Sequence, residues 1–297
     1  MTPVVTRLHP HPGSATGAAR AMGDILVASG RLSSQHAAQV LQHQQKSGLR
    51  FGDAAIDLTV LTKADIDFAL SQQFGYAYLP GQDSSLSPEL VAAYQPFSHV
   101  GENLRAVRSQ LMLRWFNSDT IHKVLATVSP GRAEGRSFIA ANLAVVFAQQ
   151  GQRTLLIDAD LRAAPGRGQQ ALFKLGKSAG LSGLLADRAG LEAVQTVPGL
   201  SGLAVLPAGA VPPNPQELLG RPHFGQLLLT LSNQFDVILI DTPAGDDYAD
   251  AEIIASRAGA ALMVARKNRS LAAHTTMLAR RLQGNGVTLV GSVLNDA

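Results

Sequence analysis

The chain has 297 residues, enough for two domains with a sizeable core, and its 46% hydrophobic and 16% charged residues are typical of an ordered globular protein. It contains no cysteine, which excludes a disulfide framework and thiol chemistry and agrees with a reducing compartment. The net charge of +3 comes from scattered basic residues, so we expect no nucleic-acid partner. No apolar run is long enough to span a membrane and no secretory signal is present, which predicts a cytoplasmic protein.

The N-terminal part of the chain contains an internal repeat. Residues 1–20 are rich in Pro, Gly, Ala and His, and we expect a disordered arm there. Residues 21–44 align without gaps with residues 50–73. Each copy predicts a short helix, a turn, an N-cap at Ser33 or Thr62, and a second helix with apolar residues at helical spacing. Because one copy cannot bury its apolar face alone, the pair predicts a small all-α module over residues 21–80 that binds a ligand or partner.

The sequence changes character after this module. Residues 81–99 carry several Pro, Ser and Gly residues and predict a linker. The next segment places Glu102, Arg105 and Arg108 at spacings of three along one side of a helix, where pairing within the helix and a contact between subunits are alternative explanations. Residues 100–297 alternate between strand and helix patterns, which predicts an α/β domain with a mainly parallel sheet.

The strongest candidate site is an apolar strand, a glycine-containing turn and a helix over residues 123–143. Backbone N–H groups of residues 129–137, together with the helix N-terminus, could hold a phosphate chain, as in a P-loop. The usual P-loop ends in Gly-Lys-Ser/Thr, where the Lys reaches the outer phosphates and the hydroxyl binds Mg²⁺. Here Gly135 is followed by Arg136 and Ser137, so arginine takes the lysine position and Ser137 is the candidate metal ligand.

Two further apolar runs end in acidic residues. Residues 153–157 lead into Asp158 and Asp160, and residues 235–240 lead into Asp241. The carboxyl ends of parallel strands meet at the edge where α/β sheets bind ligands. Asp241 resembles a Walker B carboxylate, which holds Mg²⁺ directly or through water. Capping of a helix or turn would explain any one of these acids, whereas all three together predict a site for ATP and Mg²⁺.

The repeated module resembles the MshE-type N-terminal domain of type II secretion and pilus-assembly ATPases, whose tandem motifs bind cyclic di-GMP in some members. That motif opens with Arg-Leu-Gly. The second copy has Arg50, Phe51 and Gly52, whereas the first copy has only Gly23 in register. The resemblance implies a cyclic di-GMP site formed by Gly23, Arg50 and Gly52, in which the glycines let the backbone approach the phosphates. A docking module that binds no dinucleotide is the alternative.

Residues 100–297 resemble the cytoplasmic domain of the bacterial tyrosine autokinases of exopolysaccharide and capsule synthesis, in particular the EpsG-type chain-length-determinant kinases. Besides the helix, loop and acidic motifs above, the resemblance is carried by Arg162, by Gly-Leu-Ser-Gly at residues 180–183, and by the proline-rich residues 212–219. It implies a P-loop NTPase fold like that of MinD and ParA. It also implies ATP and Mg²⁺ as cofactors and a protein-tyrosine kinase that controls polymer export and chain length.

The same resemblance implies roles for individual residues. Arg136, Asp158 and Asp160 would be catalytic, and the metal would be held by Ser137, Asp158 and Asp241. Nucleotide contacts are implied for Ala133, Glu134, Gly135, Arg136, Ser137, Phe138 and Arg162. Glu102, Arg105 and Arg108 would form a homo-oligomer. A Wzz-like chain-length regulator embedded in the inner membrane would be the partner that brings the protein to that membrane.

Two departures from the family pattern leave alternatives open. Arginine replaces the P-loop lysine, and no tyrosine-rich tail follows the last predicted strand, which leaves Tyr76, Tyr78, Tyr94 and Tyr248 as tyrosines. The first alternative is a catalytically weak nucleotide-binding regulator of the same machinery, a pseudokinase that responds to ATP or cyclic di-GMP. The second is a MinD/ParA-like positioning ATPase.

Overall fold

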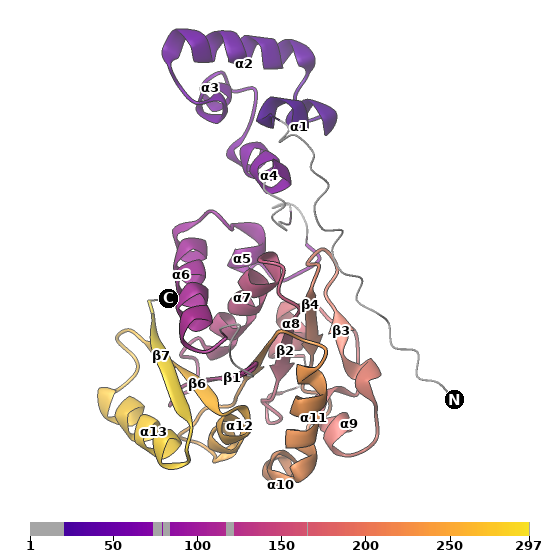
Figure 1. Cartoon of the computed structure of the whole chain (residues 1–297), viewed down its shortest axis with the longest axis vertical. Coiled ribbons are helices and arrows are strands. Elements are labelled where there is room, and N and C mark those ends of the chain that lie inside the picture. Colours follow the sequence, from indigo (N-terminus) through magenta and orange to yellow (C-terminus); the bar gives the residue numbers. More distant parts are fainter. Residues whose placement is uncertain (1–20, 74–78, 80–83, 117–121, 165, 297) are drawn as a thin grey trace. The chain divides into compact units, whose positions relative to one another are not determined.

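The computed structural model describes residues 21–73, 79, 84–116, 122–164 and 166–296. The chain divides into two compact units, residues 1–83 and residues 84–297 (Figure 1). The arm expected over residues 1–20 lies outside the described residues, as do Tyr76 and Tyr78. No helix within the described ranges is long and apolar enough to cross a membrane.

Residues 21–73 of the first unit form four helices from the two sequence repeats: α1 (Met22–Ala28), α2 (Ser34–Ser47), α3 (Phe51–Asp57) and α4 (Lys63–Gln73). Helix α1 packs on α4, and α2 packs on α3, so the two repeats make equivalent contacts with each other. Ser33 Oγ accepts the His36 N–H and Thr62 Oγ1 accepts the Asp65 N–H, which confirms both predicted N-caps. Both repeats contribute to one core, formed by Leu26, Leu32, Val40, Ala54, Ala55, Leu61 and Ala69.

The two repeat glycines lie at packing contacts. A Cβ atom at Gly23 would be 3.3 Å from the ring of Phe51, and one at Gly52 would be 3.2 Å from the side chain of Ile66. The missing side chains therefore let neighbouring helices approach, and this side of the backbone is covered by the module itself. This differs from the expected open approach of phosphates to both glycines. Arg50 is exposed at the N-terminus of α3.

The second unit is built on a seven-stranded sheet in the order β3-β4-β2-β5-β1-β6-β7. Every neighbouring pair is parallel except β3 with β4. This confirms the α/β fold with a mainly parallel sheet. The central strands β1, β2 and β5 are buried along almost their whole length, as expected for parallel strands covered on both faces. The strands are β1 (Val124–Val128), β2 (Thr154–Asp158), β3 (Gln195–Thr196), β4 (Leu203–Leu206), β5 (Val237–Asp241), β6 (Ala260–Arg266) and β7 (Thr288–Asn295).

Two groups of helices cover the sheet (Figure 1). In one group, α5 (Val91–Tyr94), α6 (His99–Arg114) and α8 (Gln169–Leu172) contact α7 (Arg136–Gln149). In the other, α10 (Pro215–Gly220), α11 (Pro222–Ser232) and α13 (Ala272–Gly284) contact α12 (Asp250–Ala258), and α9 (Gly180–Leu185) contacts α10. Helix α7 packs against β1, β2 and β5, so the helix that begins at the P-loop is anchored on the central strands.

The linker predicted over residues 81–99 is corrected by the structure, because residues 84–99 belong to the second unit. Leu86 and Leu90 are buried there. Asn142 on α7 accepts a hydrogen bond from the Ala92 N–H and donates one to the Glu89 carbonyl. Helix α5, with its buried Ala92 and Ala93, packs on α7, so a short apolar stretch within a largely polar segment fixes it to the second unit.

Candidate nucleotide-binding site

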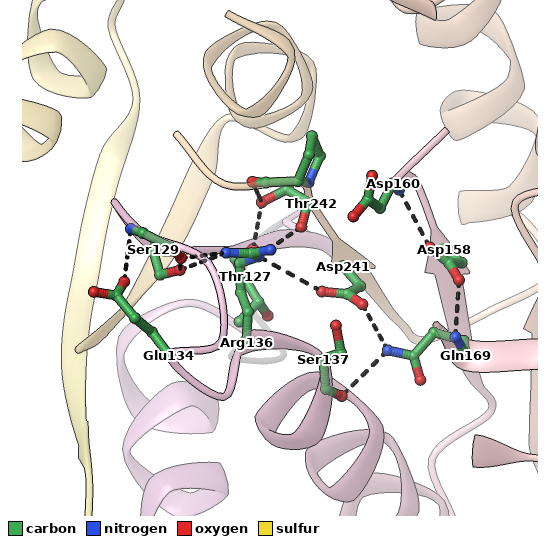
Figure 2. A network of polar contacts seen from close by, with 12 residues as sticks. Thr127, Ser129, Glu134, Arg136, Ser137, Asp158, Asp160, Gln169, Asp241 and Thr242 are labelled. Carbon is green, nitrogen blue, oxygen red and sulfur yellow. Dashed lines mark hydrogen bonds and ion pairs between the residues drawn. The ribbon is translucent and has the colours of Figure 1, made fainter. Parts of the chain in front are cut away.

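The ends of three neighbouring strands form the site. Asp158, the last residue of β2, is the register partner of Asp241, the last residue of β5. On the other side of β5, Thr127 of β1 is also paired with Asp241. The loop that follows β1 therefore begins at the same edge as the two acids (Figure 2). The structure brings together the three strand ends that the sequence motifs marked.

The loop over residues 129–135 connects β1 to α7. Gly135 has a φ angle of 96°, in the region that favours glycine, and a Cβ atom there would overlap the side-chain amide of Asn295. Helix α7 begins directly afterwards at Arg136. The first N–H groups of a helix have no partner within the helix and favour anions, so this N-terminus is suited to bind phosphate.

The Arg136 side chain is folded into this loop and only 8% exposed. Its Nε donates to the Thr242 carbonyl at 2.6 Å, and one terminal nitrogen donates to Ser129 Oγ and to the Gly131 carbonyl (Figure 2). Its Nε also lies 4.0 Å from Asp241 Oδ1. The planar guanidinium thus donates to several acceptors at once. A lysine has a single ammonium nitrogen and could not reach all of these acceptors together. It brings a fixed positive charge into the loop.

Gln169 joins the two buried acids. Its backbone N–H donates to Asp158 Oδ2 at 2.8 Å, and its Nε2 donates to Asp241 Oδ2 at 2.7 Å and to the Ser137 carbonyl at 3.2 Å. The side chain is fully buried. The sequence analysis missed this residue because it stands in a Gly- and Ala-rich stretch without a recognised motif. The glycine before it, Gly168, is the one local hint of a close contact. In the structure a Cβ atom at this position would overlap the Asp158 carboxylate.

Burial controls the protonation of the acids. Burial, and then repulsion from Asp241, raise the pKa of Asp158 to about 8. Burial also raises the pKa of Asp241, although Arg136 and the Ser137 hydroxyl oppose this shift. Two carboxyl groups this close cannot both be charged at low cost unless a cation or hydrogen-bond donors compensate them.

The oxygen atoms at this edge fit Mg²⁺. Asp241 Oδ1, Gln169 Oε1 and Thr127 Oγ1 are buried without a hydrogen-bond partner, and the Ser137 hydroxyl contacts the Asp241 carboxylate. Mg²⁺ prefers oxygen ligands and usually keeps several waters and phosphate oxygens in its shell. Within the described ranges, no group of three or more His, Cys, Asp or Glu residues could hold a metal ion by itself. The protein oxygens therefore suit a metal that arrives with a nucleotide.

Asp160 and Arg162 extend the site outward. The Asp160 N–H donates to Asp158 Oδ1, and Asp160 Oδ1 accepts the Arg162 N–H, both at 3.2 Å. The Arg162 guanidinium forms a two-pronged pair with buried Asp250, at 2.7 and 3.2 Å, and lies over the ring of Tyr248 at 3.8 Å. The hydrogen bonds and charge of Asp250 raise the pKa of Arg162. This arginine is therefore fixed in the wall of the site.

Two adjacent cavities contain every residue for which a nucleotide contact was implied. A cavity of about 410 Å³ is lined by Ala133, Arg136, Ser137 and Arg162, together with Asp160 and Asp241. A cavity of about 350 Å³ is lined by Glu134, Gly135 and Phe138, and shares Ala133, Arg136 and Ser137 with the first. The larger cavity is also lined by Arg132, Arg167 and Tyr248, which no sequence motif had marked as site residues.

Glu134 stabilises the loop through hydrogen bonds of its buried carboxylate. It is 4% exposed, and its carboxylate accepts the Gly131 N–H at 2.8 Å and the Ser270 hydroxyl. One N–H group of the loop is therefore already bonded to a side chain of the same loop. Glu134 holds the loop in shape in addition to lining the smaller cavity.

The helix motif implied in oligomer formation makes contacts within the chain. Glu102 and Arg105 pair at 2.6 Å on α6, and Arg105 also donates to the Pro96 carbonyl at 2.6 Å. Arg108 donates to the Val146 carbonyl on α7 at 3.2 Å. The structure therefore contains the pairing within the helix that was the alternative explanation of this spacing.

The chain is similar in sequence to bacterial tyrosine-protein kinases, although no family model matches it. Tyrosine-protein kinase wzc of Salmonella typhimurium is 33% identical over 208 residues, which are 70% of this chain and 28% of that protein. The putative tyrosine-protein kinase CapB of Staphylococcus aureus is 32% identical over 212 residues, which are 71% of this chain and 90% of that protein.

Solved structures show the same similarity. The kinase domain of the Escherichia coli tyrosine kinase ETK is 32% identical with a TM-score of 0.67, covering 73% of this chain and 82% of that one. The septum site-determining protein MinD of Pyrococcus horikoshii, solved with Mg-ADP, is 25% identical with a TM-score of 0.51, covering 58% of this chain and 69% of that one.

Fold and site together define a P-loop α/β protein of the MinD type, as the sequence predicted. Within this class, the chain belongs to the family of bacterial tyrosine-protein kinases. It spans 28% of the length of the Salmonella relative.

Proposed function

We propose that this chain is an ATP-dependent protein-tyrosine kinase that phosphorylates itself and regulates exopolysaccharide polymerisation and export. The proposal rests on one observation. Four side chains, those of Arg136, Ser137, Asp158 and Asp241, lie at one edge of the sheet, beside a cavity of about 410 Å³. The relatives named as tyrosine-protein kinases support tyrosine as the acceptor.

Phosphoryl transfer needs positioning and charge stabilisation more than covalent help from the protein. The N-terminus of α7 and the loop N–H groups would bind the phosphate chain. Arg136 would give up its contacts to Ser129 and Gly131 and neutralise the outer phosphates. Ser137, Asp241 and Asp158 would hold Mg²⁺, which when bound neutralises charge on the phosphates. Asp160 and Asp158 would then orient the acceptor hydroxyl and receive its proton.

The test is incubation of the purified chain with ATP and Mg²⁺, with phosphotyrosine mapped by mass spectrometry and an acidic tyrosine-containing peptide as added acceptor. We expect phosphotyrosine on the protein and the peptide, and none with Asp241→Asn. Transfer to neither acceptor, with ATP binding intact in calorimetry, would identify the pseudokinase alternative. Steady hydrolysis of ATP without transfer would identify the positioning ATPase.

Partner, assembly and location belong to the same proposal. The family implies a Wzz-like chain-length regulator in the inner membrane as partner, with this chain on the cytoplasmic side and no nucleic acid involved. A homo-oligomer through the Glu102, Arg105 and Arg108 helix is part of it. Co-purification of the chain with such a regulator from detergent extracts, compared in the presence and absence of ATP, tests the partnership.

A binding role for the first unit is a separate proposal, favoured by its two-repeat core and its exposed Arg50. The exposed guanidinium supports a cyclic di-GMP site, whereas the covered faces of Gly23 and Gly52 favour a docking role. Titration of the full chain with cyclic di-GMP decides between the two. If the dinucleotide binds, Arg50→Ala should remove most of the affinity and Lys46→Ala, another exposed basic residue of this unit, should not. A flat titration leaves the docking role.

A further inference from the structure

Tyr248 faces the proposed nucleotide site. It lies in the connection between β5 and α12 and lines the same cavity as Arg136 and Ser137. Its side chain is 41% exposed. Among the described residues, its hydroxyl group has no hydrogen-bond partner, and its one specific contact is the Arg162 guanidinium over its ring. The hydroxyl is therefore open to a reactant in this cavity.

Tyr94 shows the contrasting situation. Its hydroxyl accepts the Leu86 N–H at 3.0 Å and donates to the Leu86 carbonyl at 3.1 Å. Both bonds hold the segment before α5 in place, and Tyr94 does not line the cavity of the P-loop. Of the two tyrosines that the structure describes, Tyr248 alone combines an open hydroxyl with a place beside the phosphate-binding groups.

Two arginines line the same cavity as Tyr248. Arg162 lies 3.8 Å from the ring centroid, and Arg132, which lines the same cavity, is held at 2.6 Å by Asp247 beside Tyr248 in sequence. Both guanidinium groups therefore lie in the cavity that Tyr248 lines, where they can pair with an anionic group on its hydroxyl oxygen. Arginine pairs bind phosphate in the same way.

We propose that Tyr248 is a phosphorylation site of this chain, modified by ATP held in its own cavity, and that Arg132 and Arg162 then hold the phosphate. The proposal deepens the proposed kinase function and rests on it. A bond forms between Tyr248 Oη and the γ-phosphorus of ATP, and the bond from that phosphorus to the oxygen shared with the β-phosphate breaks. ADP leaves with that electron pair, and the phenolic proton passes to the Asp160 carboxylate, which lines the same cavity. Because donor cavity and acceptor belong to one chain, the transfer is intramolecular.

The first experiment maps phosphotyrosine on the full chain incubated with ATP and Mg²⁺ over a dilution series. We expect phosphate on Tyr248, its loss with EDTA, and a rate per molecule that does not change on dilution. Tyr248→Phe should lose this modification and the control Tyr94→Phe should keep it. A rate that falls with dilution overturns the intramolecular step.

An added tyrosine peptide separates this proposal from the proposed function. Phosphorylation of the peptide with Tyr248 unmodified overturns the proposal and leaves the kinase function intact. No transfer to peptide or protein overturns both.

The arginine contacts have their own readout, which does not depend on activity. A ³¹P NMR titration of the phosphorylated chain should give a lower second pKa for the phosphate in the folded protein than in urea, because two guanidinium groups favour the dianion. Equal values in the two states would overturn the role of Arg132 and Arg162.

Discussion

Asp158 and Asp241 are register partners on adjacent parallel strands, and each side chain is 1% exposed. Two carboxyl groups in this position are costly in a folded core unless something compensates them. In the nucleotide-free protein the compensation comes from Gln169, which donates to both, and from a proton on the pair. With a bound nucleotide, Mg²⁺ would take over that role. The same two residues therefore link stability, pH and the proposed chemistry.

We expect the metal-free and nucleotide-free protein to lose stability as pH rises between 3.8, the ordinary pKa of an aspartate, and about 8, the pKa of Asp158 in the fold. The native state holds this proton more tightly than the unfolded chain, so the unfolded chain gains relative stability as protons are removed. The free energy of unfolding should fall by up to about 1.4 kcal/mol per pH unit in this window. Urea denaturation in EDTA at several pH values measures it, and Asp158→Asn should flatten the dependence. An equal pH dependence in the variant would show that another group is responsible.

Gln169→Ala should weaken the part of nucleotide affinity that depends on Mg²⁺ more than the part that does not. The change removes the donor that orients the Asp241 carboxylate and leaves buried oxygens unpaired, at a cost in stability of about 1–3 kcal/mol. Calorimetry with ADP, with and without Mg²⁺, separates the two parts. The matched control is Gln170→Ala, because that neighbouring side chain is bonded to the exposed Gly176 carbonyl and lines neither cavity of the site. Equal losses with and without the metal would contradict the role of Gln169 at the metal site.

Arg136→Lys tests whether arginine is a working replacement for the P-loop lysine. The guanidinium bonds to Thr242, Ser129 and Gly131, and a lysine could reach only part of this set. We expect the variant to be less stable by about 1–3 kcal/mol, since buried acceptors lose their donors. It should still bind ATP more tightly than Arg136→Ala, which removes the charge altogether. A lysine variant with stability unchanged and ATP binding improved would show that Arg136 weakens the site.

The sequence predicted the strands, the P-loop and the three acids because each is a local pattern. An apolar run that ends in Asp158 or Asp241 specifies both a buried strand and the position of its carboxylate. What could not be predicted depended on distant partners. The role of Gln169 depends on β2 and β5 being neighbours in the sheet, which no local pattern shows. Residues 84–99 have the composition of a linker, and their contacts with α7 are made by a partner about 50 residues away in the sequence. Helix α12 begins only at Asp250, and the turn before it, which places Tyr248 at the cavity, carries no recognised motif.

The last prediction concerns self-association through α6. Glu102 is exposed and pairs with Arg105 on its own helix, and an arginine from a second copy could share the same carboxylate. If this contact is buried between subunits, removing one partner costs roughly 2–5 kcal/mol of association free energy. Within one chain the same pair is a surface pair worth at most about 1 kcal/mol, so the free energy of folding should hardly change.

Light scattering in the presence of ATP should therefore show an oligomer for the unmodified chain and a monomer for Glu102→Arg, with similar thermal unfolding of both. Arg188→Glu, a charge reversal at another exposed position, serves as the control and should remain oligomeric. A monomeric unmodified chain at high concentration, or an oligomer that survives Glu102→Arg, would leave the pairing within α6 as the whole explanation of this motif.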